Sequence, residues 1–302
     1  GLGDVYKRQE KCKQQILMVS HRVRRLQLGP HFVITIVATW ERIIIVEYTT
    51  NEQNEKYMLQ SVTNALRIIE LLGEYNFLTL TEIAEKLELG KSSVFRLVAT
   101  LESRGFVKKD KYGRCRLGMK FSYFGSIVLA RMEILQASRP HLEELQRNVR
   151  ETVHLAIWDD DWNIRFIDKI DGAIAFHMQS FVGLPKNCYS TATGKSMLAF
   201  MGDDFIRDFL YHVPLTPMTP HTITEPSKLL ESLDEIRRNG YCLSVEEDEL
   251  GLTCIGAPII DTSQKPIAAI SISGPTVRMT EHLSEYPKKV IDTARLISEN
   301  IS

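Results

Sequence analysis

The stretch GKSSVFRLVATLE, residues 90–102, carries apolar side chains at the spacing of a helix with one buried face. Val94, Leu97, Val98 and Leu101 follow the i, i+3, i+4, i+7 pattern. The residues between them share the opposite face, which either is simply solvated or binds a partner. These outward residues are Lys91, Ser92, Ser93, Phe95, Arg96 and Thr100.

The sequence around this helix predicts a winged helix-turn-helix over residues 58–118. Ser61 is expected to cap a first helix, and Thr79 with Glu82 has capping-box spacing for a second helix, LTEIAEKL. The third helix is expected to stop at Gly105. The runs FVKK and RCRL, joined by DKYG, predict a β-hairpin. Three helices followed by a hairpin are typical of this DNA-binding unit.

Positive charge is confined to the third helix and the hairpin. Residues 58–90 carry two basic and five acidic residues, whereas residues 91–120 carry nine basic and two acidic residues. A winged helix-turn-helix presents this part to DNA, with the third helix in the major groove and the wing along phosphates. A charge run is usually a solvated face, and for the wing alone that alternative stays open.

The residue types on the outer face favour reading of double-stranded operator DNA. Serine and threonine hydroxyls, an arginine fork and an aromatic ring can contact base edges, and lysines can contact phosphates. Phe95 has two open placements, against a thymine methyl or packed on the second helix. The predicted DNA-binding residues are Lys91, Ser92, Ser93, Phe95, Arg96, Thr100, Lys108, Lys109, Lys111 and Arg114.

Composition bounds the class of protein. A chain of 302 residues is long enough for about two domains, and its net charge of −1 indicates neither nucleic acid nor membrane by itself. Five cysteines without a CxxC pair fit a reducing cytoplasm better than a disulfide framework, and no metal site or cofactor is expected. The longest apolar run is broken by Glu41 and Arg42, so no transmembrane segment is expected.

The first 57 residues differ in texture from the rest. They open with GLGDVYKRQ, without an initiator Met, and continue as basic, irregular sequence. The opening resembles a vector or adaptor scar, so residues 1–57 are interpreted as a non-native leader or a mis-called start, with the native chain beginning at Met58. The alternative is a genuine basic arm.

The remaining residues predict a linker helix and an α+β domain. MKFSYFGSIVLARMEIL predicts a linker or dimerisation helix over 119–133, and the second domain is placed at 134–302, with a helix from near Pro140. VHLAIW, IRFIDKI, AIAFHM, TCIGAPII and IAAISIS are β-type runs separated by turn signals. Helices are expected at about 203–211, 225–238 and from Pro287, which together indicate a largely antiparallel sheet.

The tripeptide GKS occurs twice without forming a phosphate loop. A Walker A loop needs a further Gly five residues before the GK glycine, and those positions hold Glu85 and Tyr189. The second GKS lies in STATGKS, which opens a helix. Thr191, Thr193 and Lys195 therefore either cap this helix or place an anion at its exposed amides.

Three motifs in order resemble the IclR family of bacterial transcriptional regulators. They are the helix-turn-helix run from Ser61 to Val107, YSTATGKSMLAF, and EEDELGLTCIGAPIIDTSQKPIAAISISGP. The resemblance implies a winged helix-turn-helix, a dimerising linker helix and a C-terminal effector-binding domain of GAF-like α+β fold. It also implies a homodimer or homotetramer, acting as repressor or activator, that senses a small carboxylate.

The resemblance places the effector site on seven residues. The helix start maps to Ala192, Thr193 and Gly194, the GLTC segment to Cys254, and SISGP to Ser271 and Ser273. Ser244 stands where some relatives have an Asp, which puts a hydroxyl-binding role there in doubt. The segment FVGLPKNCY is expected to add Leu184 and Cys188 as an apolar wall.

These observations predict a cytoplasmic DNA-binding regulator, a repressor by preference, controlled by a small carboxylate such as a sugar acid. Cys254 in an apolar strand is most often core packing, and no base is patterned beside it as a cysteine nucleophile needs. No catalytic residue is expected, and no membrane partner. The alternative is a stand-alone small-molecule sensor or an enzyme whose helix-turn-helix mediates protein contacts only.

Overall fold

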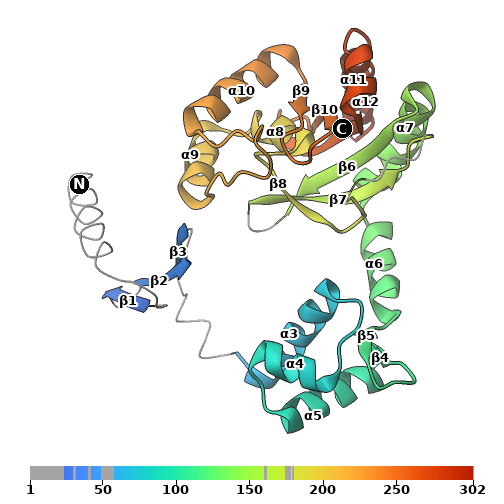
Figure 1. Ribbon diagram of the computed structural model, residues 1–302. Helices are drawn as coiled ribbons and strands as arrows, with labels where there is room; N and C mark the ends of the chain where they lie inside the picture. The colour runs from blue at the N-terminus through green and yellow to red at the C-terminus, as the bar shows by residue number, and fades with distance from the viewer. Residues whose placement is uncertain are drawn as a thin grey trace. The chain divides into compact units, whose positions relative to one another are not determined.

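The computed structural model describes residues 24–29, 32–39, 42–48, 58–159, 162–173, 178 and 180–301. The chain divides into two compact units, Gly1–Phe121 and Ser122–Ser302, which are described separately (Figure 1). The first 57 residues were interpreted as a non-native leader and carried no fold prediction; runs rich in β-branched residues there form a three-stranded antiparallel sheet. Its strands, in spatial order, are β1 (Arg24–Gly29), β2 (Phe32–Thr39) and β3 (Arg42–Tyr48).

The predicted winged helix-turn-helix is present, with three helices and a two-stranded wing. Val94, Val98 and Leu101 of the third helix are buried in one apolar core with Ile68 and Ile83 of the other two. Burying each such side chain stabilises the fold by roughly 1.5–3 kcal/mol. The elements are α3 (Gln60–Glu74), α4 (Leu80–Leu87), α5 (Lys91–Ser103), β4 (Val107–Lys109) and β5 (Cys115–Leu117).

The sequence predicted two N-terminal caps in this unit, and the structure contains one of them. The capping box is confirmed, because the Thr79 hydroxyl accepts from the Glu82 amide at 3.3 Å and the Glu82 carboxylate accepts from the Thr79 amide at 2.7 Å. Capping by Ser61 is wrong. Helix α3 begins at Gln60, two residues before the start that a Ser61 cap would give, so Ser61 lies inside the first turn. Gly105, past the end of α5, has φ +79°, as expected for the glycine that stops a helix.

Two helices follow the wing. None of the residues of α6 (Lys120–Ala130) is buried, although Tyr123, Phe124 and Val128 are apolar. Helix α7 (Glu133–Val149) packs Leu142 and Leu145 into the core of the second unit. The expected start near Pro140 is wrong: this proline lies inside α7, where it removes one backbone hydrogen bond while buried residues after it hold the helix.

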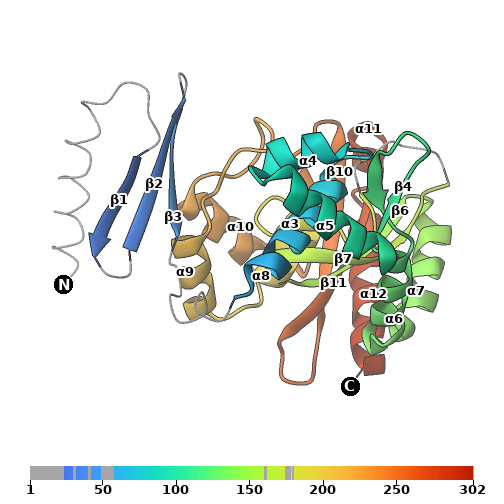
Figure 2. The same ribbon diagram turned by 90° about the horizontal axis from the view of Figure 1, so that it is seen from below.

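A six-stranded, wholly antiparallel sheet organises the second unit, as the α+β prediction required. Its spatial order is β8-β7-β6-β11-β10-β9. Figure 1 labels β6 to β10 of this sheet, and Figure 2 labels β11. The short strands β8 and β9 were not among the expected β-type runs, and residues 174–177 of the AIAFHM run lie outside the described residues. The strands are β6 (Thr152–Trp158), β7 (Asn163–Ile170), β8 (Pro185–Asn187), β9 (Cys242–Val245), β10 (Leu252–Ile260) and β11 (Pro266–Pro275).

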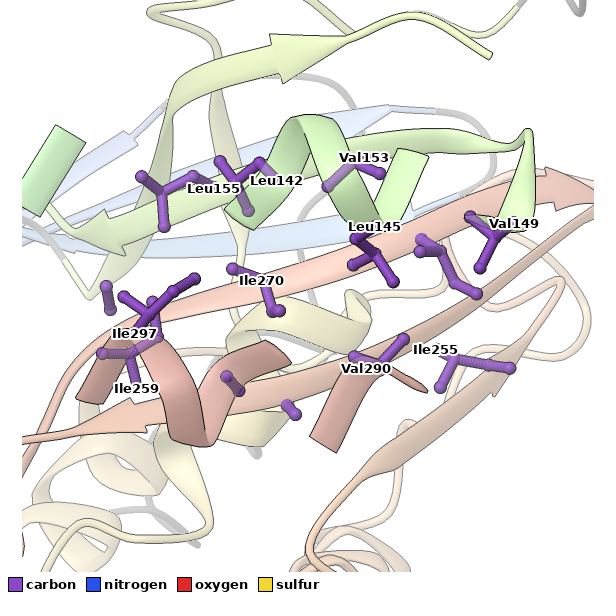
Figure 3. Packing of buried hydrophobic residues seen from close by; sticks show 14 of the residues in the cluster. Leu142, Leu145, Val149, Val153, Leu155, Ile255, Ile259, Ile270, Val290 and Ile297 are labelled. Atoms are coloured by element: carbon purple, nitrogen blue, oxygen red, sulfur yellow. The ribbon is translucent and has the colours of Figure 1, made fainter. Parts of the chain in front are cut away.

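Helices cover both faces of this sheet. On one face α7 and α12 (Tyr286–Ile301) pack against Val153, Ile255 and Ile270 (Figure 3). On the other lie α8 (Ala192–Leu198), α9 (Asp203–His212) and α10 (Pro226–Asn239), whose positions agree with the expected helices. A short helix that was not expected, α11 (Thr276–Glu281), follows β11.

The strand register determines which side chains share the α8 face. Cys254 on β10 pairs with Ser244 on β9 and with Ser273 on β11. Two residues away, Ser271 pairs with Gly256 on one side and with His154 of β6 on the other. Because side chains alternate between the faces of a strand, these polar groups lie together opposite the apolar core.

The capping box gives a first test. Thr79→Ala removes the hydroxyl that accepts from the Glu82 amide, so we expect the winged helix-turn-helix to lose about 1 kcal/mol of unfolding free energy. Urea unfolding of the full chain, followed by a probe in residues 58–118, measures this loss. Thr81→Ala, an exposed threonine on the same helix, is the matched control. Equal stabilities of the two variants would contradict a capping role for Thr79.

Candidate nucleic-acid interface and ligand pocket

Helix α5 has two chemically distinct faces. Its apolar stripe is buried, while Lys91, Ser92, Ser93, Arg96 and Thr100 are all exposed. Phe95 is 56% exposed, so it lies on the outer face rather than packed on α4. The predicted reading residues therefore form one continuous exposed surface on this helix.

Some basic residues of the wing form ion pairs within the unit, and others are exposed. Lys109 pairs with Glu102 at 3.2 Å, and its ammonium lies 5.6 Å from the centre of the Phe95 ring. Arg114 pairs with Asp110 at 2.8 Å within the hairpin turn. Lys108 and Lys111 are exposed on the hairpin. Lys109 and Arg114 thus shape the wing, whereas Lys108 and Lys111 expose their charge to solvent.

A pocket with both apolar and polar lining lies between the sheet of the second unit and the start of α8. Its volume is about 480 Å³, including the open mouth. Apolar and aromatic side chains supply much of its surface, and seven hydroxyl-bearing residues and a few charged groups share the lining. The lining residues are His154, Phe166, Met178, Ser180, Lys186, Ser190, Thr191, Ala192, Thr193, Ser244, Asp248, Glu249, Leu252, Cys254, Ser271 and Ser273.

Six of the seven expected effector-site residues line this pocket. They are Ala192, Thr193, Ser244, Cys254, Ser271 and Ser273. Gly194 does not line it; a Cβ there would lie 2.3 Å from the Cys188 Cα, so this glycine lets α8 approach the preceding segment. Leu184 and Cys188 pack in the apolar core beneath α8 instead of forming a pocket wall.

The sequence left two roles open for the helix start in STATGKS, namely capping of the helix and binding of an anion. Thr191 caps α8, since its hydroxyl accepts from the Gly194 amide at 3.2 Å. Lys195 pairs with Glu247 at 2.5 Å, with both side chains buried. Burial lowers the pKa of the Lys195 ammonium, but Cys242 and Glu247 raise it by more, so it stays charged. Lys195 is a structural cation, and neither GKS is a phosphate loop.

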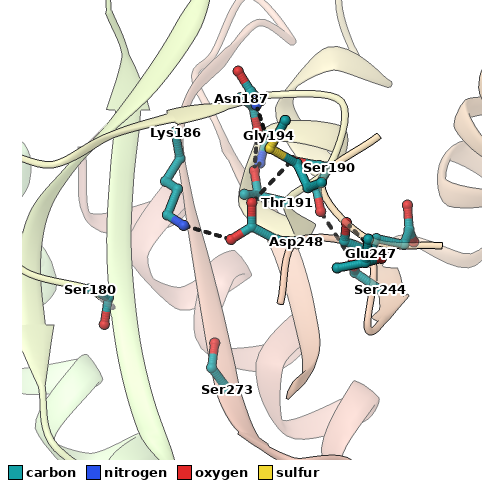
Figure 4. A network of polar contacts seen from close by, with 12 residues as sticks. Ser180, Lys186, Asn187, Ser190, Thr191, Gly194, Ser244, Glu247, Asp248 and Ser273 are labelled. Carbon is teal, nitrogen blue, oxygen red and sulfur yellow. Dashed lines mark hydrogen bonds and ion pairs between the residues drawn. The ribbon is translucent and has the colours of Figure 1, made fainter. Parts of the chain in front are cut away.

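Threonine hydroxyls fix the loop between β9 and β10. Thr219 donates to the Glu246 carbonyl and Thr222 to the Glu247 carbonyl, both at 2.6 Å. Together with the Lys195–Glu247 pair, these contacts hold the first two residues of the loop, Glu246 and Glu247, in place. The next residue, Asp248, then reaches the pocket (Figure 4).

Sequence reasoning missed five polar residues of the pocket, which are His154, Ser180, Lys186, Asp248 and Glu249. His154 hydrogen-bonds Ser180 at 3.0 Å and stacks on Phe166. Asp248 pairs with Lys186 at 2.6 Å. No sequence pattern joins these residues, which come from four separate segments. A histidine within the otherwise apolar run VHLAIW and a lysine within FVGLPKNCY were the available signals.

The electrostatics of the pocket disfavour nucleophilic catalysis. Desolvation raises the pKa of the Cys254 thiol to about 12, so it remains protonated at neutral pH. Burial, aided by the nearby Lys169, lowers the pKa of His154 to about 3, so its imidazole is neutral. Within the described part of the chain, no group of three or more His, Cys, Asp or Glu side chains is placed to hold a metal ion.

An exposed basic recognition helix and wing in one unit, with a polar ligand pocket in the other, define a ligand-responsive DNA-binding regulator. Comparison with known families agrees: the IclR helix-turn-helix domain matches residues 61–111, and the C-terminal domain of the bacterial transcriptional regulator IclR matches residues 126–299. The chain therefore belongs to the IclR family of transcriptional regulators, which is not a family of enzymes. No described helix is long and apolar enough to cross a bilayer.

Individual relatives show how far the similarity extends. The HTH-type transcriptional regulator KdgR of Escherichia coli is 35% identical over 245 residues, covering 80% of this chain and 92% of that protein. The transcriptional repressor IclR of E. coli is 32% identical over 244 residues, covering 80% and 89%. The crystal structure of the Thermotoga maritima IclR protein is 35% identical, with a TM-score of 0.69, over 80% of this chain and 98% of that one.

Acid titration tests the environment of His154. As the pH falls below about 6.5, the unfolded chain takes up a proton that folded His154 does not, so the free energy of unfolding falls by up to about 1.4 kcal/mol per pH unit. The loss continues until the pH reaches the folded pKa of about 3. In His154→Gln this contribution is absent, and the pH slope should be shallower. A His154 NMR resonance that titrates near pH 6.5 would contradict the assignment.

Proposed function

We propose that this chain is a transcriptional repressor, acting in the cytoplasm, whose binding to operator DNA is controlled by a small carboxylate. The observation that carries the proposal is the combination, in one chain, of the exposed basic face of α5 with a hydroxyl-lined pocket in the second unit. The E. coli relative named as a repressor supports the direction of control.

The two parts of the DNA surface have different roles. Arg96 and the hydroxyls of Ser92, Ser93 and Thr100 lie where base edges would be contacted, because the third helix of such a unit enters the major groove. The exposed lysines of the wing would contact phosphates, which sets register and affinity but reads no sequence.

A dimer fits this mode of binding. Helix α6 leaves Tyr123, Phe124 and Val128 without burial in the single chain, and such apolar side chains favour pairing with a second copy. Two heads in a homodimer, or in a homotetramer of two dimers, would read half-sites about 34 Å or a multiple apart. A ligand that binds one arrangement of the heads better than another shifts that equilibrium and so the affinity for operator.

The pocket chemistry favours a small hydroxylated acid. The hydroxyls of Ser271 and Ser273 lie two residues apart on one strand face and line the same pocket as Ala192 and Thr193 at the start of α8. These donors suit a carboxylate, and the further hydroxyls of Ser180, Ser190 and Thr193 suit hydroxyl groups on the same molecule. A sugar acid has this combination of groups.

Substitution of Arg96 tests the reading face. Arg96→Ala should weaken binding to the operator by about 1–3 kcal/mol while leaving non-specific binding nearly unchanged, because it removes a bidentate contact to a base. Electrophoretic mobility shifts with operator and scrambled DNA measure both affinities. The matched control is Arg104→Ala, an exposed arginine at the C-terminal end of α5 with the same charge. Wild-type operator affinity in Arg96→Ala would contradict base reading by this residue.

Thermal shift of the full chain tests the effector class. Screening small carboxylates against neutral analogues of the same length should identify acids that raise the melting temperature through binding to the folded state. Ser271→Ala should weaken such an acid about tenfold or more, because one hydrogen bond to a charged group is lost. Ser263→Ala, in the β10–β11 turn, is the control. An equal shift in the wild type and Ser271→Ala would remove Ser271 from the site.

A further inference from the structure

An ion pair spans the pocket. Lys186 on β8 and Asp248 in the β9–β10 loop meet at 2.6 Å, so they join two walls of the cavity that come from distant parts of the sequence (Figure 4). The side chains are 22% and 14% exposed. The second oxygen of Asp248 accepts a hydrogen bond from the Ser190 hydroxyl at 3.1 Å. The DNA-reading role of the chain does not use this pair.

Lys186 is the one permanent cation among the described lining residues. The other charged lining groups are the carboxylates of Asp248 and Glu249, and His154 is neutral. Without a change in these contacts, an anionic ligand would enter a cavity whose charged side chains sum to a net negative charge. Its attraction to the pocket then depends on access to the Lys186 ammonium.

The contacts that hold the β9–β10 loop limit which residues can move when a ligand binds. Glu247 is held by Lys195, and Thr219 and Thr222 hold the backbone before Asp248. Asp248 is also held by Ser190, so its carboxylate can release Lys186 and keep one partner. Exchange of one carboxylate for another at a half-buried ammonium keeps the charge paired, whereas a second carboxylate added beside the first meets like-charge repulsion.

We propose that Lys186 is the cationic partner of the ligand in this pocket, and that the carboxylate bound by the Ser271 and Ser273 hydroxyls pairs with Lys186 by replacing Asp248. Asp248 is then an exchangeable counter-ion of Lys186, and the free energy needed to break this pair sets the threshold for ligand binding. The site selects monocarboxylates over dicarboxylates, because a second carboxylate would face the displaced Asp248 and Glu249. This inference rests on the proposed carboxylate-responsive function and names the residue pair that determines specificity.

Acetate, the minimal monocarboxylate probe, tests the exchange in the full chain. Asp248→Asn preserves the shape of the side chain and its contact with Ser190 but leaves Lys186 without its counter-ion. The dissociation constant of the Asp248→Asn variant for acetate should be at least about tenfold lower than that of the wild type. Thermal shift with acetate against chloride, at constant ionic strength, measures it. Lys186→Met combined with Asp248→Asn should abolish this gain. Operator binding and circular dichroism report whether each variant is folded.

The control variant removes the same charge from the same loop. Glu246→Gln lies two residues before Asp248 and outside the pocket lining, so its acetate affinity should equal that of the wild type. If Asp248→Asn gains no acetate affinity, or if the gain survives loss of Lys186, the exchange is wrong. A gain of equal size in Glu246→Gln would reduce the effect to general electrostatics and would also overturn it.

A larger acid separates this inference from the proposed function. Gluconate and malate, tested on the same variants, compare a hydroxylated monocarboxylate with a hydroxylated dicarboxylate. If acids stabilise the wild type and the Lys186→Met variant equally, carboxylate sensing stands and the role of Lys186 fails. If no carboxylate stabilises the wild type or Asp248→Asn, the proposed effector class fails together with this inference. A preference of the wild type for malate over gluconate would contradict the selection of monocarboxylates.

Discussion

The register of β11 between β10 and β6 is the constraint on which the second unit depends. Ile270 and Ile272 face the apolar core, and Ser271 and Ser273, the residues that follow each of them, face the pocket. A slip of one residue would exchange the two sets and bury hydroxyl groups among apolar side chains, at about 1–3 kcal/mol for each unsatisfied group. The interactions that stabilise the core therefore also determine the chemistry of the pocket.

The buried pair of Lys195 and Glu247 holds the loop after β9 against helix α8. It joins the second turn of α8 to the loop that follows β9, over a separation of 52 residues in the chain. Removal of one partner from a buried pair leaves an uncompensated charge, which typically destabilises a protein by about 3–5 kcal/mol. The position of Asp248 in the pocket follows from this anchor, because it is the next residue along the loop.

In the winged helix-turn-helix a single helix both stabilises the domain and presents its binding surface. The apolar stripe of α5 is shared with α3 and α4, which fixes the rotation of the helix about its axis. That rotation decides which side chains remain outside. The wing adds positive charge beside them, and its internal pairs, Lys109 with Glu102 and Arg114 with Asp110, fix the shape of the hairpin.

The sequence by itself determined the elements whose signals are local. Helical spacing in residues 90–102, the capping box at Thr79 and the β-type runs of the second domain predicted the winged helix-turn-helix and the antiparallel sheet. Two of the three family motifs located most of the pocket lining. Local signals failed at Pro140, which a helix can accommodate, and at Ser61, where the helix begins one residue before the expected cap.

Only the tertiary structure decided which polar residues meet. His154, Lys186 and Asp248 lie on β6, β8 and the β9–β10 loop, and Lys195 turned from a candidate ligand group into a buried partner of Glu247. Periodicity reports how a side chain faces its own helix or strand, within a few residues. Contacts across a sheet depend on strand pairing and loop anchoring over long separations, and neither leaves a pattern in a single sequence.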